Sequence, residues 1–460
     1  MSQGDEAADG LAQFRELISD ERTYEKPGTP GVDPALRRRR RRRGALIGGI
    51  VTVVILALVG VYAGYTLTAP VGAAEVSAAV PKIATPAAAK IALPAEGAAA
   101  ISVAGADAYL GPGASGVWAS SGGGEPRPIA SISKIITAMV VLDAKPLDGP
   151  GAAGPTLRFD AADHALYDKY YVLGATIAEM PTGSSMSEHD ALETMLVVSA
   201  CNYAEAVAEW AFGSESAFLA AARTWLAAHG LSQTTLVEPT GVDTRNTSTP
   251  GDLLTLARLA AADPVIAGIV RMPRLDVPGL APLPNTNDLL GVDGVSGIKT
   301  GTLDESGSNL LFSAALPVGT GDPLSVTGVM LGGRSHAAVN DDVAALLTSI
   351  TNGFHDVPLT QPGQKVGRYT TPWGASAGIV VADRASVFTW SDTPITATID
   401  TTTITTGARG DDVGRITWTA GPRTATASLA LDSDIPLPSA WWRLTHPFDL
   451  GGQARSVSAG

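Results

Sequence analysis

The sequence predicts a mixed α/β (α+β) domain between an N-terminal membrane-spanning helix and a C-terminal all-β domain. Three observations support this fold class: an uncharged apolar segment near the N-terminus, a central region in which strand-like runs flank helical runs, and a C-terminal region of short alternating strands. At 460 residues the chain is long enough for two or three folded units of about 100 to 200 residues each.

The apolar segment has the length of a membrane span. Residues 44–67 carry no charged side chain and would be about 36 Å long as a helix, against a hydrocarbon core of about 30 Å. The arginine run Arg37–Arg43 directly precedes it, and the positive-inside rule places such a cluster in the cytoplasm. We expect a single-pass protein of the cell membrane, with residues 1–43 as a disordered, basic cytoplasmic tail. A cleaved signal peptide is the alternative, because small residues follow the segment.

The remaining chain divides by composition. Residues 68–96 are rich in Ala and Pro and are expected to be an extracellular linker. Residues 97–354 have strand-like runs at both ends, which predicts a sheet built from both ends of this region and covered by an inserted helical cluster. Helices are expected at 131–143, 188–212, 216–229 and 250–261, and strands at 308–316 and 324–331. Residues 358–460, in which Val, Ile and Thr alternate with small or polar residues, are expected to be a β domain.

Charge and composition exclude several classes of function. The formal net charge is −13, although the first 43 residues are slightly basic, so the body of the protein is acidic. An acidic body argues against a nucleic-acid partner. A single cysteine, Cys201, excludes a disulfide within the chain, and the six histidines lack metal-ligand spacing, so no metal site is expected.

The first motif with chemical meaning is Ser131-Ile132-Ser133-Lys134, at the start of a helical run that is apolar nearly all round. Spacing of three residues places Ser131 and Lys134 on one helical face. A serine hydroxyl becomes a nucleophile when a neighbouring base takes its proton, and a buried lysine can be that base. Backbone N–H groups at the helix start would stabilise developing negative charge.

The second motif is Lys299-Thr300-Gly301-Thr302. On a strand, the period of two places Thr300 and Thr302 on one face as hydroxyl donors, while Gly301 lets another element approach closely. Lys299 would supply a fixed positive charge for an anionic group of the substrate.

A third candidate, Ser199, lies between these motifs in the sequence SACN, within the expected helix 188–212. It is either a proton relay between Lys134 and a leaving amine or a helix hydroxyl without a catalytic role.

The ordered set S-x-x-K, S-x-[NC] and K-T-G is similar to the penicillin-recognising serine enzymes. The flanking segments resemble the D-alanyl-D-alanine carboxypeptidases among the low-molecular-mass penicillin-binding proteins, peptidase family S11. These segments are IASISKIITAMVVLD, LETMLVVSACNYAEAVAE, VEPTGVDTRNTSTPGDLLTLARLA, NTNDLL and GVSGIKTGTLDESGSNLLFSA, within roughly residues 100–333. The resemblance implies a penicillin-binding-protein/β-lactamase-like catalytic domain with a mainly antiparallel sheet, a helical subdomain and no cofactor.

The resemblance also implies an activity. The chain would be a serine-type D-Ala-D-Ala carboxypeptidase that acts on peptidoglycan stem peptides and is acylated by β-lactam antibiotics. Ser131 would be the acylated nucleophile, Lys134 its general base and Ser199 the proton relay. The backbone N–H groups of Ser131 and Thr302 would form the oxyanion hole.

By the same resemblance, Lys299 and Thr300, helped by Thr302, would hold the terminal carboxylate of the stem peptide, with Gly301 completing the motif. Cys201 departs from the family pattern, because it stands where these enzymes usually have Asn. The missing amide affects substrate positioning and the balance between hydrolysis and transpeptidation.

Three alternatives stay open. A serine β-lactamase needs a carboxylate that activates the deacylating water, and Glu238 is the candidate, although Thr240-Gly241 after it resembles the peptidase family. A DD-transpeptidase would transfer the acyl group to an amine. A catalytically silent cell-wall-binding homologue would have no use for both intact lysine motifs.

Overall fold

The computed structural model describes residues 34–451, which form two compact units. Within this range, one unit contains the chain up to Ala74, the loop Thr371–Ala375 and the segment from Pro436 onward. The other contains Glu75–Thr370 and Ser376–Ile435. Residues 1–33 of the expected disordered tail lie outside the described residues.

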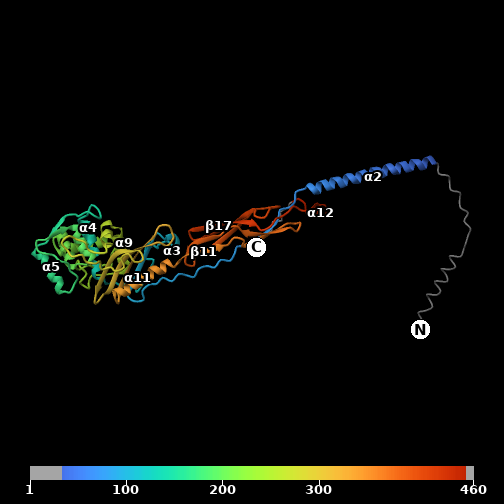
Figure 1. Ribbon diagram of the computed structural model, residues 1–460. Coiled ribbons are helices and arrows are strands. Elements are labelled where there is room, and N and C mark those ends of the chain that lie inside the picture. Colours follow the sequence, from blue (N-terminus) through green and yellow to red (C-terminus); the bar gives the residue numbers. More distant parts are fainter. Residues whose placement is uncertain (1–33, 452–460) are drawn as a thin grey trace, which may run out of the picture. The chain divides into compact units, whose positions relative to one another are not determined.

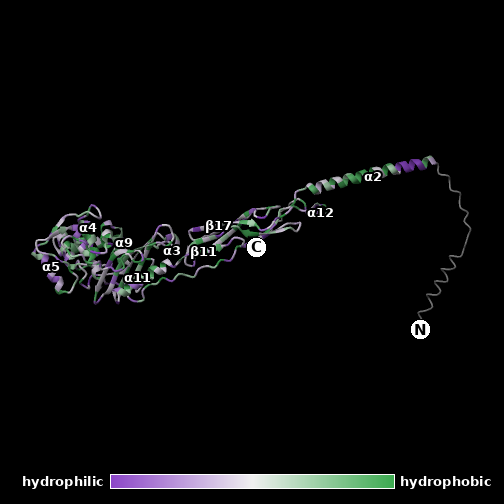
Figure 2. Ribbon diagram, viewed as in Figure 1, coloured by the Kyte–Doolittle hydropathy of each residue, from purple (hydrophilic) through white to green (hydrophobic). Residues whose placement is uncertain are grey.

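The first unit contains helix α2 (Pro34–Thr68) and the short helix α12 (Ala440–Thr445). Helix α2 is long and apolar enough to cross a membrane, and Figure 2 shows its hydrophilic arginine end followed by a mainly hydrophobic length. The helix begins at Pro34, so Arg37–Arg43 are helical, which corrects the expectation of a disordered tail up to residue 43. Arginine is a good helix former, and proline is favoured in the first helical turn.

The second unit is built on a five-stranded antiparallel sheet with the order β3-β2-β10-β9-β8. Strands from both ends of the expected 97–354 region therefore pair in one sheet, which confirms the fold class. The strands are β2 (Ala98–Ala104), β3 (Ala119–Ser121), β8 (Val295–Leu303), β9 (Gly307–Leu316) and β10 (Leu324–Gly333). Figure 1 labels the helices α4, α5, α9 and α11 of the same unit, whose bounds are given below.

Helices pack on both faces of this sheet. Alternate strand residues face opposite sides, so Leu311 and Val329 join the core of the helical cluster, while Phe312 and Met330 pack with α11 (His336–Thr351). The helical cluster contains α4 (Ser133–Ala144), α5 (Ala161–Val172), α6 (Glu188–Val197), α7 (Cys201–Phe212), α8 (Glu215–Ala228), α9 (Pro250–Ala262) and α10 (Pro264–Val270).

Local hydrogen bonds explain where several helices begin. The Ser187, Ser214 and Thr249 side chains each accept a bond from a backbone N–H in the first turn of the following helix. Short elements complete the region: α3 (Asp107–Leu110), the 3₁₀ turn η1 (Ala130–Ile132), the pair β4 (Arg127–Pro128) with β7 (Thr247–Ser248), and the pair β5 (Thr156–Arg158) with β6 (Ser185–Ser187).

The expected helix 188–212 is in fact two helices. Helix α6 ends at Val197 and α7 begins at Cys201, and between them Ser199 has a left-handed backbone with φ of 67°. Apolar periodicity continues across this break, so the pattern does not reveal it. Ser199 therefore lies in a turn before α7, and not inside a helix.

The C-terminal region is all β up to Leu431, as the alternating pattern predicts. A six-stranded antiparallel sheet has the order β1-β12-β13-β17-β16-β15, and the pair β11–β14 packs beside it through β14. The strands are β1 (Glu75–Ala78), β11 (Phe354–Thr360), β12 (Lys365–Thr370), β13 (Ser376–Val381), β14 (Ala385–Trp390), β15 (Ile395–Thr401), β16 (Asp412–Ala420) and β17 (Arg423–Leu431). Strand β1 comes from the expected linker 68–96, so part of that segment is an edge strand of this sheet.

Candidate active site

Ser131 lies in η1, directly before the first turn of α4, and is partly exposed. Lys134 is one turn further on and its side chain is fully buried. The preceding residue, Ala130, has a left-handed backbone with φ of 49°, a conformation that costs free energy in a residue other than glycine. The sharp bend presents the Ser131 hydroxyl at the start of a helix that is otherwise buried.

Three groups surround the Lys134 ammonium. Its Nζ lies 2.9 Å from Ser131 Oγ, 2.7 Å from the Thr240 carbonyl oxygen and 3.3 Å from Cys201 Sγ. The contacts come from η1, from the loop after Glu238 and from the start of α7, so distant parts of the chain fix the lysine. This geometry suits proton transfer between Ser131 and Lys134.

Two glycines allow the backbone to close around Ser131. A Cβ on Gly241, which has φ of 88°, would lie 1.9 Å from the Ala130 carbonyl oxygen. A Cβ on Gly301 in β8 would lie 3.1 Å from the Ser131 nitrogen. The close approach expected at Gly301 is therefore an approach to the serine motif itself, and it brings the two lysine motifs together.

Glu238 organises the loop that supplies the Thr240 carbonyl. Its carboxylate accepts bonds from the backbone N–H groups of Thr240 and Gly241, both at 2.6 Å, and from the Asn246 side chain at 2.9 Å. Asn246 in turn donates to Ser133 Oγ of the serine motif. Both Glu238 oxygens therefore accept hydrogen bonds from their own loop, and the carboxylate stabilises that loop.

Lys299 is almost fully buried in β8, beside Thr300. Its Nζ donates to Thr286 Oγ1 at 3.3 Å, and Thr300 Oγ1 donates to the same oxygen at 2.6 Å. Burial and, to a smaller extent, the positive charge of Lys134 lower the pKa of Lys299 to about 7, while Cys201 opposes the shift. Among residues 34–451 no carboxylate pairs with this buried cation, and such a cation favours an anionic ligand.

Thr302 is exposed at the end of β8, and its Oγ1 lies 2.6 Å from His336 Nε2, at the start of α11. Burial lowers the pKa of His336; the charge of Asp288 raises it, and that of Lys299 lowers it. The neutral imidazole is therefore the favoured form near pH 7, and Thr302 keeps a neutral partner.

In the middle motif, Cys201 contacts Lys134 and Ser199 does not. The hydrogen bonds of Lys134 Nζ within residues 34–451 go to Ser131, Cys201 and Thr240. Ser199 is buried in the turn two residues before Cys201. Asn202 is directed elsewhere, because its amide pairs with both backbone groups of Ala178. Ser199 therefore stands two residues from a contact of Lys134, but its own hydroxyl does not hydrogen-bond that lysine.

A buried polar network lies behind this site. Glu205 is one turn along α7 from Cys201, and its carboxylate accepts from Tyr170 Oη at 2.5 Å and from Lys169 Nζ at 2.6 Å. The Thr240 side chain lies close enough to the same tyrosine hydroxyl to affect it. Burial and the Glu205 carboxylate raise the pKa of Tyr170, so its hydroxyl stays protonated. The network connects half-exposed Lys169 to the loop that holds Lys134.

Sequence reasoning missed three groups of this site. Thr286 lies in the segment NTNDLL, which carries the family resemblance, so that segment was the available signal. His336 and the pair Tyr170–Glu205 lie outside any motif, and only the fold brings them to the site. The S-x-x-K pattern also occurs a second time, at Ser296 and Lys299. These residues lie on β8, where residues three apart face opposite sides of the sheet, so they cannot act as a pair.

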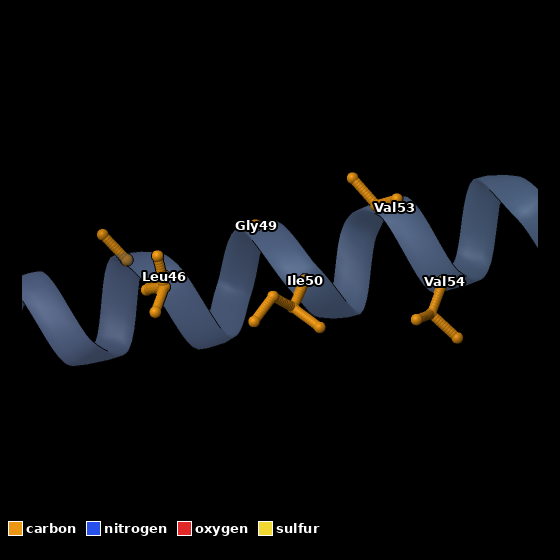
Figure 3. Close-up of a pocket in the computed structure, with 6 residues that line it drawn as sticks. Leu46, Gly49, Ile50, Val53 and Val54 are labelled. Carbon is orange, nitrogen blue, oxygen red and sulfur yellow. The ribbon is translucent and has the colours of Figure 1, made fainter.

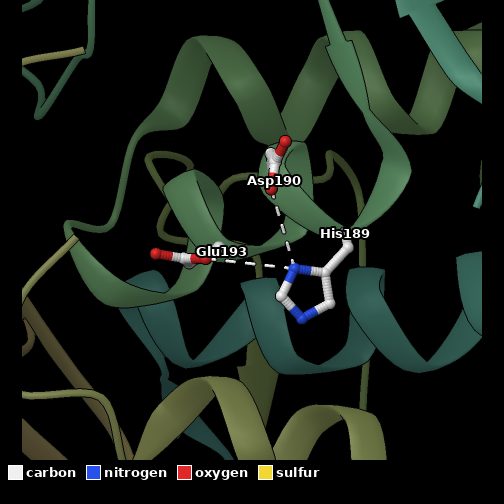
Figure 4. A group of neighbouring side chains, drawn as sticks. All are labelled: His189, Asp190 and Glu193. Carbon is white, nitrogen blue, oxygen red and sulfur yellow. Dashed lines mark ion pairs between the residues drawn. The ribbon is translucent and has the colours of Figure 1, made fainter. Parts of the chain in front are cut away.

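Two other features do not build a site. His189 Nδ1 lies 3.8 Å from Asp190 Oδ1 and 3.9 Å from Glu193 Oε2 (Figure 4), but Glu193 also accepts from the Asp276 N–H. Ion pairing and local hydrogen bonds account for this cluster. A shallow hollow along α2 is lined only by that helix, with Leu46, Ile50 and Val54 extending from it in Figure 3.

The chain resembles known peptidases over the segment that contains this geometry. Residues 113–322 match the family model described as D-alanyl-D-alanine carboxypeptidase, Peptidase S11. The matched segment contains both lysine motifs, the Glu238 loop and Thr286.

Two D-alanyl-D-alanine endopeptidases are similar to part of this chain. The D-alanyl-D-alanine endopeptidase of Escherichia coli K12 is 32% identical over 199 residues, and that of Pseudomonas aeruginosa is 30% identical over 197. Each match covers 41% of this chain and 60% of the relative. Among solved structures, the D-alanyl-D-alanine carboxypeptidase of Francisella tularensis is 17% identical and has a TM-score of 0.49, covering 78% of this chain and 98% of that one.

Proposed function

We propose that the chain is a serine-type D-Ala-D-Ala carboxypeptidase that acts on peptidoglycan stem peptides through an acyl-enzyme on Ser131. The observation that carries this proposal is the 2.9 Å contact between Ser131 Oγ and the buried Lys134 Nζ, beside the second buried cation, Lys299. A nucleophile with a base and a fixed positive charge matches a peptide substrate that ends in a carboxylate.

In the first half-reaction, Lys134 Nζ takes the proton of Ser131 as the hydroxyl oxygen attacks the carbonyl carbon of the penultimate D-alanine. The backbone N–H groups of Ser131 and Thr302 stabilise the resulting oxyanion, a contribution of about 3 to 4 kcal/mol per donor at other acyl-transfer sites. The C–N bond then breaks, and Ser199 relays a proton to the leaving D-alanine amine. The Thr240 carbonyl and Cys201 keep Lys134 in place during the transfer.

The second half-reaction is hydrolysis. Water attacks the acyl carbon, Lys134 accepts its proton, and Ser131 leaves with that proton restored. Lys299, Thr300 and Thr302 hold the terminal carboxylate of the peptide before cleavage. The engagement of Glu238 in its own loop argues against a β-lactamase that would use this carboxylate to activate water.

A second candidate is a DD-endopeptidase that cleaves cross-links between stem peptides, because both curated relatives carry that name. Liquid chromatography of digested muropeptides distinguishes the two. The purified chain is incubated with pentapeptide monomers and, separately, with cross-linked dimers. Release of free D-alanine from monomers with intact dimers supports the carboxypeptidase. Conversion of dimers to monomers without release of D-alanine from pentapeptides supports the endopeptidase.

We also propose that α2 is an uncleaved anchor, with Arg37–Arg43 in the cytoplasm and residues after 67 outside. Its length, mean hydropathy and flanking arginines support this arrangement. The mass of the mature protein in membranes tests it: the full-chain mass supports the anchor, and a mass that begins after residue 67 shows a cleaved signal. Protease added to intact spheroplasts should remove the domains after residue 67 and leave the arginine end protected.

A further inference from the structure

The first unit carries exposed apolar side chains that the proposed enzyme does not use. Trp441 is 74% exposed, Phe448 97% and Leu437 63%. They lie on α12 or beside it, near the C-terminal end of the described chain. Large aromatic side chains with such high exposure indicate a surface that contacts a membrane or a protein partner.

This surface is attached to the end of α2. The Tyr62 hydroxyl donates to the Leu444 carbonyl at 2.6 Å, and Arg443 Nη1 donates to the Ala69 carbonyl at 2.7 Å. The Gly451 N–H donates to the Pro70 carbonyl. Arg443 Nη1 also donates to the Leu67 carbonyl at 3.4 Å, in the last turn of α2, where a cation is favourable, and these bonds fix α12 against the helix terminus.

The length of α2 gives the depth of this contact. About 20 helical residues cross a hydrocarbon core of about 30 Å. Counted from Arg43, the last residue of the arginine run, the outer boundary falls near Tyr62 and Tyr65, both of which are exposed. Tyrosine and tryptophan are enriched at this boundary in membrane proteins. Helix α12 is thus attached at the level where lipid headgroups begin.

The division of side chains within α12 is consistent with a membrane face. Trp442 packs inside the unit, with its ring 6.0 Å from Trp373 and 4.9 Å from His446, while the neighbouring Trp441 is exposed. Trp373 is fixed by its own bond to the Pro436 carbonyl. One aromatic residue therefore secures the segment, and its neighbour is free to contact lipid.

We propose that Trp441, Phe448 and Leu437 form a second membrane contact, in which this segment inserts into the headgroup and upper acyl region of the outer leaflet beside α2. The partner is the phospholipid surface, because the bonds to the end of α2 hold these side chains at the depth of the lipid headgroups. This inference rests on the proposed insertion of α2.

The test uses the full chain in vesicles of phosphatidylethanolamine and phosphatidylglycerol, with a fluorophore on single introduced cysteines. The native Cys201 is buried, and the labelled wild type measures its background. The variants are Phe448→Cys and Trp441→Cys at the proposed surface, Leu56→Cys in α2, and Val172→Cys as an 83% exposed control in the catalytic region. Each label is quenched with nitroxide lipids and, separately, with aqueous iodide.

We expect nitroxide lipids to quench the labels at Phe448→Cys and Trp441→Cys at least twofold more than iodide does, with the reverse at Val172→Cys. Quenching of Leu56→Cys by lipid, with Phe448→Cys and Trp441→Cys quenched only by iodide, would overturn the inference and leave the anchor standing. Protection of these two labels from both quenchers would show that protein covers the surface, which also overturns it. Iodide quenching at Leu56→Cys would refute the anchor and the inference together.

Discussion

The Nζ atom of Lys134 lies 2.9 Å from Ser131 Oγ while the Thr240 carbonyl, 106 positions along the chain, accepts from the same nitrogen at 2.7 Å. The serine motif supplies both reacting groups, but the loop after Glu238 determines where the lysine points. The position of the general base therefore depends on the folded loop as well as on the serine motif.

Lys134→Arg tests whether Lys134 acts as the general base. Arginine in Lys134→Arg stays protonated and cannot accept the Ser131 proton. We expect acylation by benzylpenicillin to slow by about 10²- to 10⁴-fold in stopped-flow measurements, with the fold retained. Lys145→Arg, at an exposed lysine just after α4, is the control and should acylate at the wild-type rate. An acylation rate in Lys134→Arg equal to that of wild type would exclude lysine as the base.

The depressed pKa of Lys299 predicts a pH dependence of substrate capture. With a pKa of about 7, Lys299 is charged below pH 7 and loses its charge as the pH rises above it. The value of kcat/KM for a peptide with a free terminal carboxylate should therefore fall about tenfold per pH unit above 7, because kcat/KM reports the free enzyme.

The same peptide with a terminal amide is the control, since it has no charge for Lys299 to bind. The ratio of the two kcat/KM values should fall with rising pH in the wild type and stay flat in Lys299→Arg. A ratio independent of pH in the wild type would be inconsistent with carboxylate recognition by Lys299.

Two buried tyrosines test whether the Glu205 network positions the base. Tyr170→Phe removes the hydroxyl between Glu205 and Thr240, and we expect acylation to slow about fivefold, as for the loss of one hydrogen bond of about 1 kcal/mol. Tyr203→Phe removes a hydroxyl of another buried tyrosine, which donates to the Glu179 carbonyl at 2.7 Å and not to any partner of Lys134. Equal acylation rates in the two variants, at similar losses of thermal stability, would assign the network to stability alone.

Glu188 predicts a second pH effect, on stability. The side chain is fully buried at the start of α6, neither carboxylate oxygen has a hydrogen-bond partner within the described residues, and burial raises its pKa to about 7. Because the folded-state pKa lies above the unfolded value near 4.5, the folded state is favoured below pH 4.5 and loses stability as the pH rises through 7.

Glu188→Gln removes this ionisation and keeps the shape of the side chain. We expect the variant to match the wild type near pH 4.5 and to exceed its unfolding free energy by on the order of 1 to 3 kcal/mol at pH 8. Thermal unfolding of both proteins in detergent across this range measures the difference. A constant difference between Glu188→Gln and wild type at all pH values would disprove the linkage.

Much of the fold could be predicted because hydrophobic periodicity is local. The helices near 131–143, 216–229 and 250–261 and the strands β9 and β10 follow directly from it, and so does the β-rich C-terminal region. The break at Ser199 could not be predicted, because one left-handed residue leaves the apolar pattern unchanged on either side. Pairing of β1 with β12 depends on contacts across about 290 positions, which no local pattern records.

The site was partly predictable for the same reason. Ser131, Lys134, Lys299 and Thr300 stand in short motifs whose spacing reflects one helix face or one strand. Thr240, Tyr170 and His336 act through tertiary contacts, and two of the three bonds of Lys134 come from outside its own motif. Motifs locate the reacting atoms, whereas the residues that orient those atoms become visible only when the loops are folded.

The central claim is that Ser131 is acylated. Intact-protein mass spectrometry of the full chain with benzylpenicillin tests it most directly. The account predicts one lasting adduct of the mass of benzylpenicillin on the wild type and none on Ser131→Ala, with Ser133→Ala, altered two residues away, still labelled. An adduct that persists in Ser131→Ala, or a folded wild type that takes no adduct, would contradict it.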